Sequence, residues 1–213
     1  MKHWIFDFDG TLFDTVGPYH MAVEKIFAIY GLPFGPQVLV EAMRYFDPND
    51  FFALYLEPRF VKEAVAHLIR LNHEHADDVR EFPGIRDLLE SLRGHDLALS
   101  VWTARERETA VRILANTKLD HHFERCVSGT CVSKRKPHPE GLLKILKESK
   151  HRNDEVVMIG DHEYDMSAAR EVGVKAVSVS WADPKMAEKM AALSDHHFHR
   201  VADFKEWALG HYR

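Results

Sequence analysis

The chain has 213 residues, of which 46% are hydrophobic and 29% charged, and its formal net charge at pH 7 is −5. These values are typical of one soluble α/β domain, or of a core with a modest insert. The acidic balance, with no basic run longer than residues 134–136, argues against a nucleic-acid partner.

Two further classes are disfavoured by local sequence. No apolar run approaches the length of a membrane span. Asp7 and Asp9 interrupt the N-terminal segment where a signal peptide would need a continuous apolar region. The two cysteines, Cys126 and Cys131, form neither a CxxC motif nor a metal-ligand spacing, so a disulfide framework is not expected. We therefore expect a cytoplasmic protein without a membrane partner.

Two kinds of segment alternate along most of the chain. Short continuous apolar runs, typical of strands buried on both faces of a parallel sheet, lie near residues 3–8, 97–102, 125–128, 155–160 and 174–179. Segments with helical spacing of apolar residues lie between them, at about 84–93, 105–114, 139–146 and 166–172. A short edge strand near 195–199 and a last helix from Val201 follow. This alternation predicts the α/β class with a doubly wound, Rossmann-like parallel sheet.

Residues 15–82 interrupt the alternation. Helical spacing of apolar residues begins at Val23 and recurs through residues 61–71, and no strand-like run lies between them. We expect a small all-helical insert over residues 15–82, which leaves residues 1–14 and 83–213 as the α/β core. Most aromatic residues in the middle of the insert are expected to form its own core; they are Tyr45, Phe46, Phe51, Phe52, Tyr55 and Phe60.

Two carboxylates and a tight turn follow the first apolar run, as Asp7, Asp9, Gly10 and Thr11. Two like charges at the end of a buried strand cost free energy unless a cation or a proton compensates them. Open α/β sheets bind their ligands outside the carboxyl ends of the strands. The pattern therefore indicates a functional site at this end of the first strand.

Three later segments carry polar side chains in comparable places. Thr103 and Ala104 directly follow the apolar run that ends at residue 102. Lys136 lies in a basic loop that two prolines stiffen. Asp161 follows the apolar run at 156–160, and Asp165 comes four residues later. Because the carboxyl ends of parallel strands lie at one edge of a sheet, these side chains are expected near the first two carboxylates.

The four segments, in this order, resemble the four signature motifs of the haloacid dehalogenase-like (HAD) superfamily. Those motifs are DxDGT, a serine or threonine at a strand end, a lysine before a proline-containing loop, and GDxxxD. The resemblance covers nearly the whole chain and is greatest to the phosphoglycolate phosphatase-like subgroup. It implies a Rossmann-like core, and it implies that the helical insert is a cap that closes over the active site.

The resemblance also implies a role for each residue of the first motif. Asp7 would attack phosphorus and become an aspartyl phosphate, and Asp9 would protonate the leaving alcohol and then activate water. With other carboxylates around it, Asp9 is expected to hold a proton, as a general acid must. Gly10 and Thr11 would bind beside the phosphate, where they allow the chain to turn tightly.

The second and third motifs would bind the phosphoryl oxygens. Thr103 and the backbone N–H of Ala104, expected at a helix start, would donate hydrogen bonds to them. The alternative that Thr103 is simply an N-cap stays open. Lys136, directly before a proline, would neutralise the phosphoryl charge, whereas Lys134 is expected in solvent. Arg105 is expected to be a solvated residue at the helix start, and the alternative that it faces the substrate stays open.

The fourth motif would hold Mg²⁺, which prefers oxygen ligands in octahedral geometry. The implied ligand set is Asp7, the backbone carbonyl of Asp9, and Asp161. Asp165 lies about one helical turn beyond Asp161 and is expected to face the same site. Asp165 is expected to act through water or a hydrogen bond rather than to bind the ion directly. Direct binding stays open, as does the alternative that Asp165 only favours the helix N-terminus.

The implied function is a Mg²⁺-dependent phosphatase that hydrolyses a small phosphorylated metabolite. A phosphomutase resembling β-phosphoglucomutase is the alternative, because its catalytic core would be nearly identical. A dehalogenase is disfavoured, since Asp9 and Asp161 would lack a purpose in it. A non-catalytic phosphate-binding protein is disfavoured too, because each catalytic position of the motifs is present.

Several features do not enter this interpretation. His196, His197 and His199 alternate along the expected edge strand, and a surface role is favoured over weak metal binding. Arg44 and Tyr45 in the insert are candidate specificity residues. The motifs identify neither the phosphorylated substrate nor the oligomeric state.

Overall fold

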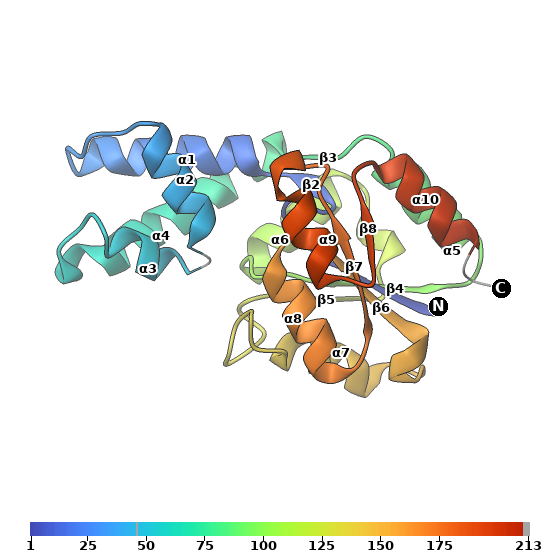
Figure 1. Ribbon diagram of the computed structural model, residues 1–213. Helices are drawn as coiled ribbons and strands as arrows, with labels where there is room; N and C mark the ends of the chain where they lie inside the picture. Colours follow the sequence, from blue (N-terminus) through green and yellow to red (C-terminus); the bar gives the residue numbers. More distant parts are fainter. Residues whose placement is uncertain (46, 211–213) are drawn as a thin grey trace. The chain divides into compact units, whose positions relative to one another are not determined.

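The structure, a computed structural model, describes residues 1–45 and 47–210. The chain divides into two compact units (Figure 1). One unit contains Met1–Asp14 and the chain from Arg80 onward, and the other is Thr15–Val79. The first unit carries the sheet, and the described part of the second is entirely helical.

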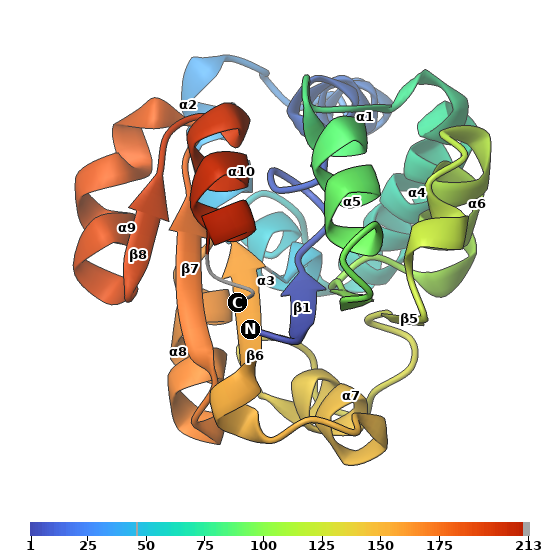
Figure 2. The ribbon, with the colours of Figure 1, turned by 90° about the vertical axis from the view of Figure 1, so that its right-hand side faces the viewer.

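The larger unit is built on a parallel sheet of six strands in the order β5-β4-β1-β6-β7-β8 (Figure 2). In chain order the strands are β1 (His3–Phe6), β4 (Ala98–Trp102), β5 (Arg125–Val127), β6 (Val156–Gly160), β7 (Lys175–Val179) and β8 (His196–Phe198). β1 and β6 are fully buried, as continuous apolar runs predict. In the central register, Phe6 lies beside Val101 on one side and Ile159 on the other, so β1, β4 and β6 end at the same edge.

Helices cover both faces of this sheet. Those of the described residues are α5 (Ile85–Arg93), α6 (Arg107–Asn116), α7 (Glu140–Glu148), α8 (Glu163–Val172), α9 (Ala187–Leu193) and α10 (Val201–Gly210), with short 3₁₀ helices η2 (Asp120–His122), η3 (Asn153–Glu155) and η4 (Pro184–Met186). α8 and α9 pack on one face, whereas α5 and α10 lie side by side on the other (Figure 1). Within the described residues, no helix is both long enough and apolar enough to cross a membrane. The predicted doubly wound α/β fold is confirmed.

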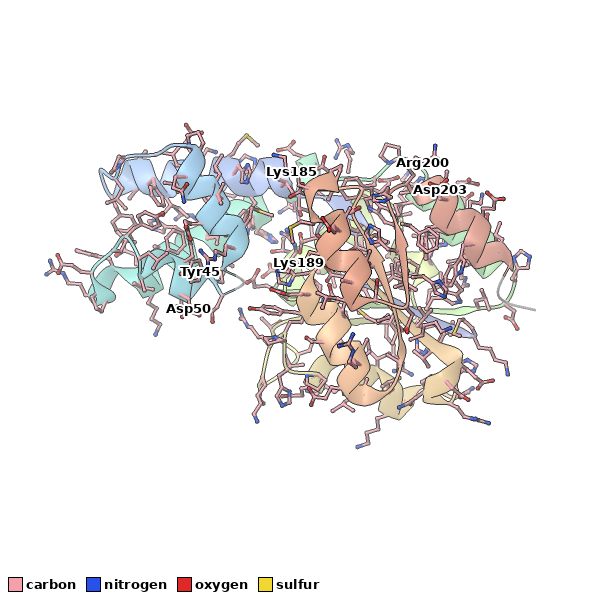
Figure 3. All side chains as sticks on the ribbon, in the orientation of Figure 1. Tyr45, Asp50, Lys185, Lys189, Arg200 and Asp203 are labelled. Atoms are coloured by element: carbon pink, nitrogen blue, oxygen red, sulfur yellow. The ribbon has the colours of Figure 1, made fainter. Side chains whose placement is uncertain are left out.

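The packing of these helices follows from their sequences. In α5, the buried residues Ile85, Leu88, Leu89 and Leu92 recur at i, i+3, i+4 and i+7, which places them on one face. The neighbouring helix α10 carries a surface ion pair near its start. At the start of α10, Arg200 Nε donates to Asp203 Oδ2 at 2.8 Å (Figure 3).

A second, two-stranded antiparallel sheet joins β2 (Phe13–Asp14) to β3 (Arg80–Glu81). The N–H of Phe82 donates to the carbonyl of Leu12 at 3.0 Å beside this pair. These contacts hold together the two points where the chain leaves and re-enters the larger unit. β2 and β3 carry no strand signal in the sequence, because two residues are too few to show an alternation of apolar and polar side chains.

The smaller unit contains α1 (Val16–Ile29), α2 (Pro36–Arg44), α3 (Pro48–Phe52), α4 (Pro58–Glu74) and the 3₁₀ helix η1 (His75–Asp78). Its core is aromatic, as expected: Phe51 and Phe52 are fully buried, and Tyr55 packs against them. Tyr45, at the end of α2, also packs against this core (Figure 3). Phe46, which the sequence analysis placed with these aromatics, lies outside the described residues.

The expected edge strand is β8, which pairs in parallel with β7. His197 uses both ring nitrogens there: Nδ1 lies 2.7 Å from the Ser178 hydroxyl and Nε2 lies 3.1 Å from the Ser180 hydroxyl. The Ser180 hydroxyl also lies 3.1 Å from Nδ1 of His199. Because its nitrogens are engaged by serines, the His197 ring is not available as a metal ligand; it ties β8 to β7.

Candidate active site

The site is built on the adjacent carboxyl ends of β1, β4 and β6. Asp7 follows β1, Thr103 follows β4, and Asp161 follows β6. The N–H of Asp7 donates to the carbonyl of Ile159 at 2.7 Å, and that of Thr103 donates to the carbonyl of Val127 at 3.0 Å. These bonds continue the sheet ladder one residue beyond the strands, so the side chains project from a fixed backbone.

Three carboxylates meet at this edge. Asp7, Asp161 and Asp165 each offer an oxygen, and these oxygens lie within 4.8 Å of one another. Asp7 and Asp165 are buried and Asp161 is half-buried. The structure therefore brings together three carboxylates that the sequence places as far as 158 positions apart.

Lys136 is the basic residue that reaches these carboxylates. Its Nζ lies 2.6 Å from Asp7 Oδ1 and 2.6 Å from Asp165 Oδ1. The Lys136 side chain is 2% exposed, and its Nζ lies 4.4 Å from the centroid of the Trp102 ring. Lys134, in contrast, is exposed, as the sequence analysis expected.

The electrostatics of the cluster follow from burial. Burial raises the pKa of Asp7 to about 7, with Asp165 adding to the rise and Lys136 opposing it. Burial also raises the pKa of Asp161, and the charges of Asp7 and Asp165 add to it. Three carboxylates face one ammonium group here, so the cluster holds an excess of negative charge. A divalent cation would balance that excess, and carboxylate oxygens are the ligands that Mg²⁺ prefers, so the residues fit a magnesium site.

Asp165 is held by protein donors at both of its oxygens. Oδ1 accepts from Lys136, and Oδ2 accepts from the N–H of His162 at 3.3 Å in a capping box at the start of α8. A Cβ atom at residue 160 would lie 2.2 Å from Asp165 Oδ2, so only glycine fits there. Asp165 thus anchors Lys136 and the first turn of α8, whereas Asp7 and Asp161 face each other across the cluster.

The Gly-Thr turn packs directly against Asp161. Gly10 has φ +75°, and a Cβ atom there would lie 2.1 Å from Asp161 Oδ2. The Thr11 hydroxyl donates to Asp161 Oδ1 at 3.1 Å. The turn therefore orients a carboxylate of the cluster, a contact that the sequence analysis did not anticipate.

The segment after β4 differs from its predicted form. α6 begins at Arg107 with Glu106 as its N-cap, so the expectation that Ala104 stands at a helix start is wrong, and so is the N-cap alternative for Thr103. The Thr103 hydroxyl instead accepts from the N–H of Arg105 at 3.0 Å. Residues 104 and 105 form a bend that this hydrogen bond closes, and the extended residue Glu106 then leads into the helix.

Arg105 is not solvated, which corrects the expectation from sequence. Its side chain is 9% exposed, and its Nε lies 3.1 Å from Oδ1 and 3.3 Å from Oδ2 of Asp9. Nη2 also donates to Oδ1 of Asp9. Asp9 was expected among other carboxylates, and the structure adds a guanidinium group in direct contact with it. The sequence places both residues at one edge of the sheet, because Arg105 follows β4 and Asp9 follows β1, but it does not distinguish a buried arginine from a solvated one.

Comparison with known proteins identifies the family. Residues 4–179 match the model of the haloacid dehalogenase-like hydrolase family. The chain belongs to this family. The predicted enzyme class, a HAD-like hydrolase of the phosphatase type, is confirmed at this level.

Two curated relatives of this HAD-like hydrolase are named pyrophosphatase PpaX. Pyrophosphatase PpaX of Halalkalibacterium halodurans is 31% identical, over 84% of this chain and 83% of its own. Pyrophosphatase PpaX of Bacillus mycoides is 27% identical, over 93% of each chain. A crystal structure of a predicted phosphoglycolate phosphatase from Haemophilus somnus superposes with a TM-score of 0.85 at 20% identity, over 98% of each chain. At that identity the superposition shows the fold alone.

One further residue of this HAD-like hydrolase, distant in the sequence, contacts the turn beside Asp161. The indole N–H of Trp181, just after β7, donates to the carbonyl of Thr11 at 3.0 Å. The Trp181 ring also lies 6.2 Å from the Phe204 ring. Trp181 thereby fixes the turn that orients Asp161. No motif in the sequence marked it, because its partner lies 170 positions away.

Proposed function

We propose that this hydrolase is a Mg²⁺-dependent phosphatase that acts on a small phosphorylated metabolite of the cytoplasm through an aspartyl phosphate on Asp7. The observation that carries the proposal is the group of Asp7, Asp161 and Asp165 at one edge of the sheet, with Lys136 paired to Asp7 and Asp165. The relatives named pyrophosphatase PpaX support phosphoryl transfer as the reaction class. They also make inorganic pyrophosphate the first compound to test.

The metal would be held by the carboxylates of Asp7 and Asp161 and by the backbone carbonyl of Asp9. When bound, Mg²⁺ supplies positive charge that offsets the charge on the phosphoryl oxygens. Lys136 supplies a second, permanent positive charge beside Asp7. The Thr103 hydroxyl and the N–H of Ala104 supply hydrogen-bond donors for the phosphoryl oxygens.

In the first half of the proposed reaction, a carboxylate oxygen of Asp7 attacks phosphorus. The bond between phosphorus and the leaving oxygen breaks, and the electron pair stays on that oxygen. Asp9 transfers a proton to it, so the product leaves as an alcohol or, from pyrophosphate, as phosphate. Lys136 remains paired with Asp165 while Asp7 carries the phosphoryl group.

In the second half, Asp9 takes a proton from a water molecule. The water oxygen attacks phosphorus, and the bond between phosphorus and Asp7 breaks with its electron pair returning to the carboxylate. Phosphate leaves, Asp7 is again a carboxylate, and Asp9 again holds the proton. The net reaction consumes one water for each phosphate released, and no other reactant is needed.

The helical unit is proposed to be the cap that selects the substrate, with Arg44 and Tyr45 as candidate specificity residues. The sequence predicts a helical insert over residues 15–82, and the helical unit of the structure is Thr15–Val79. Substitution of Arg44 by alanine is expected to change KM for the preferred substrate more than kcat, because the residue would bind substrate without taking part in the chemistry.

The test is a phosphate-release screen with MgCl₂ and, in parallel, with a chelator. The panel contains inorganic pyrophosphate, 2-phosphoglycolate, several sugar phosphates and p-nitrophenyl phosphate. The proposal expects Mg²⁺-dependent release from at least one compound, lost in the Asp7→Asn variant. Isomerisation of a sugar phosphate without phosphate release would instead favour the mutase, and release that is unaffected by Asp7→Asn would contradict the mechanism.

A further inference from the structure

The backbone of Arg105 is clamped from two strand ends. Its N–H donates to the Thr103 hydroxyl at 3.0 Å, and its carbonyl accepts from the N–H of Gly129 at 2.9 Å. A Cβ atom at residue 129 would lie 2.2 Å from the carbonyl oxygen of Ala104, so only glycine permits this approach. The loop after β5 therefore fixes the point from which the Arg105 side chain starts.

The Arg105 side chain is fixed at its other end too. Its guanidinium carbon lies 5.8 Å from the centroid of the buried Phe8 ring, and two of its nitrogens contact the carboxylate of Asp9. A guanidinium is planar, so a fork of two nitrogens on one carboxylate sets the orientation of that carboxylate as well as its position. Lysine could supply the charge but not this constraint.

The Asp9 side chain stays 38% exposed although Arg105 grips it. Asp9 therefore combines a fixed orientation with access to a reactant. We propose that Arg105 is a positioning residue that holds the Asp9 carboxyl in the orientation from which it serves the leaving oxygen. This inference rests on the proposed function, in which Asp9 exchanges a proton with that oxygen.

Removal of Arg105 would have a different effect on the kinetics if its ion pair with Asp9 were purely structural. Loss of a structural pair lowers stability and affects every substrate alike. Loss of a positioning contact misplaces one catalytic group, and a displacement of about 1 Å can cost about 10²-fold in rate. In the first half of the reaction, such a loss is felt only by substrates whose leaving oxygen needs a proton, because a group that leaves as a stable anion does not need the Asp9 proton. The second half, in which Asp9 activates water, is common to all substrates, so the two halves are separated by measuring kcat/KM, which covers only the steps up to departure of the leaving group.

The experiment compares two esters at saturating Mg²⁺. In 2-phosphoglycolate the leaving group is an alkoxide that needs a proton, and in p-nitrophenyl phosphate it is a phenolate that does not. For Arg105→Ala we expect kcat/KM on 2-phosphoglycolate to fall by about 10- to 100-fold and kcat/KM on p-nitrophenyl phosphate to fall by less than about 3-fold. Arg105→Lys, which keeps the charge and loses the fork, should show the same selectivity with a smaller loss.

A double-mutant cycle with Asp9→Asn tests whether Arg105 affects the rate through Asp9. Because Arg105 acts through Asp9, adding Arg105→Ala to Asp9→Asn should lower the rate on 2-phosphoglycolate no further. Arg152→Ala, which removes an arginine whose side chain is 80% exposed, is the matched control and should leave both rates unchanged. Thermal unfolding of each variant verifies that it is folded.

The outcomes separate the inference from the proposed function. A loss on 2-phosphoglycolate no larger than that on p-nitrophenyl phosphate in Arg105→Ala overturns the positioning role. If Asp9→Asn still distinguishes the two esters in that case, the proposed function stands and only the inference fails. If Asp9→Asn does not distinguish them, Asp9 is not the proton donor, and both fail together.

Discussion

The buried polar groups at the two ends of β1 have opposite environments. At the amino end, His3 places Nδ1 2.9 Å from the Ser149 hydroxyl and Nε2 2.9 Å from the Ser100 hydroxyl. Burial lowers the pKa of His3 to about 4, so the ring is neutral at pH 7. At the carboxyl end, Asp7 lies among charged groups, and burial raises its pKa.

The difference shows where the fold is stabilised and where function is placed. His3 has a partner at each ring nitrogen and no charge to neutralise, which is the arrangement expected of a buried polar group that contributes to stability. Around Asp7 the negative charges outnumber the positive one, an excess that a bound cation or a proton would balance. Substitutions at the two ends should therefore separate stability from activity.

The largest effect is expected at the carboxyl end, from Asp7→Asn. The amide keeps the size of the side chain but removes the nucleophile, so kcat for phosphate release should fall by about 10³-fold or more. The measurement is phosphate release by the purified variant under saturating Mg²⁺. The circular dichroism spectrum should match that of the parent protein, and residual activity within about 10-fold of the parent would be inconsistent with covalent catalysis by Asp7.

A smaller loss is expected from Asp161→Asn, which removes one proposed metal ligand. The Asn oxygen can still accept from Thr11, but the carboxylate charge is lost, so the Mg²⁺ concentration for half-maximal activity should rise by about 10- to 100-fold. In chelator, removal of a buried charge beside Asp7 should raise the free energy of unfolding by about 1–2 kcal/mol.

Titration of activity with Mg²⁺ and thermal unfolding in chelator check the two parts of that prediction. Asp154→Asn, which changes an exposed carboxylate that pairs with Arg152, is the matched control and should alter neither quantity. An unchanged Mg²⁺ requirement in Asp161→Asn would place the ion elsewhere.

At the amino end, the expected effect is on stability alone. In the unfolded chain His3 binds a proton near pH 6.5, and in the folded protein only near pH 4. Between these values the unfolded state binds more protons, so the free energy of unfolding falls as the pH is lowered through this window, by about 3 kcal/mol in all. His3→Gln should flatten that slope and leave kcat at pH 7 within about 2-fold.

Urea unfolding at several pH values between 4 and 7 measures the slope. His121→Gln, at an exposed histidine, should leave the slope as it is in the parent protein. Equal slopes in His3→Gln and the parent would assign the acid sensitivity to other groups.

The smallest effect is expected from Trp181→Phe. Phenylalanine keeps a ring near Phe204 but cannot donate to the Thr11 carbonyl, so the turn against Asp161 loses one hydrogen bond. A loss of about 1 kcal/mol corresponds to a rate about 5-fold lower. The rate of phosphate release should fall by that factor. An unchanged rate would contradict the role of Trp181 in fixing the turn.

The sheet was predictable because its strands are buried on both faces and therefore read as continuous apolar runs. The elements that were not predicted lack such a signal. β2 and β3 are two residues each and exist only through their mutual pairing. α9 was not predicted because Met190 is its single buried residue, so its seven residues show no apolar stripe.

The candidate site divides along similar lines. Asp7, Lys136, Asp161 and Asp165 could be grouped from sequence, because three of them follow strand ends or open a helix and all match family motifs. The contact of Arg105 with Asp9 could not, since it joins residues 96 positions apart and nothing local distinguishes a buried arginine from a solvated one. That contact depends on the tertiary structure and has no signature in the local sequence.

The central claim is that Asp7 carries the phosphoryl group during turnover. The direct measurement is to quench the enzyme with acid during turnover of its best substrate, reduce it with borohydride, and map the modified residue by mass spectrometry. An aspartyl phosphate is reduced to homoserine, so the account predicts homoserine at position 7 and at no other carboxylate. Homoserine at another position, or its absence under conditions of rapid turnover, would contradict the account.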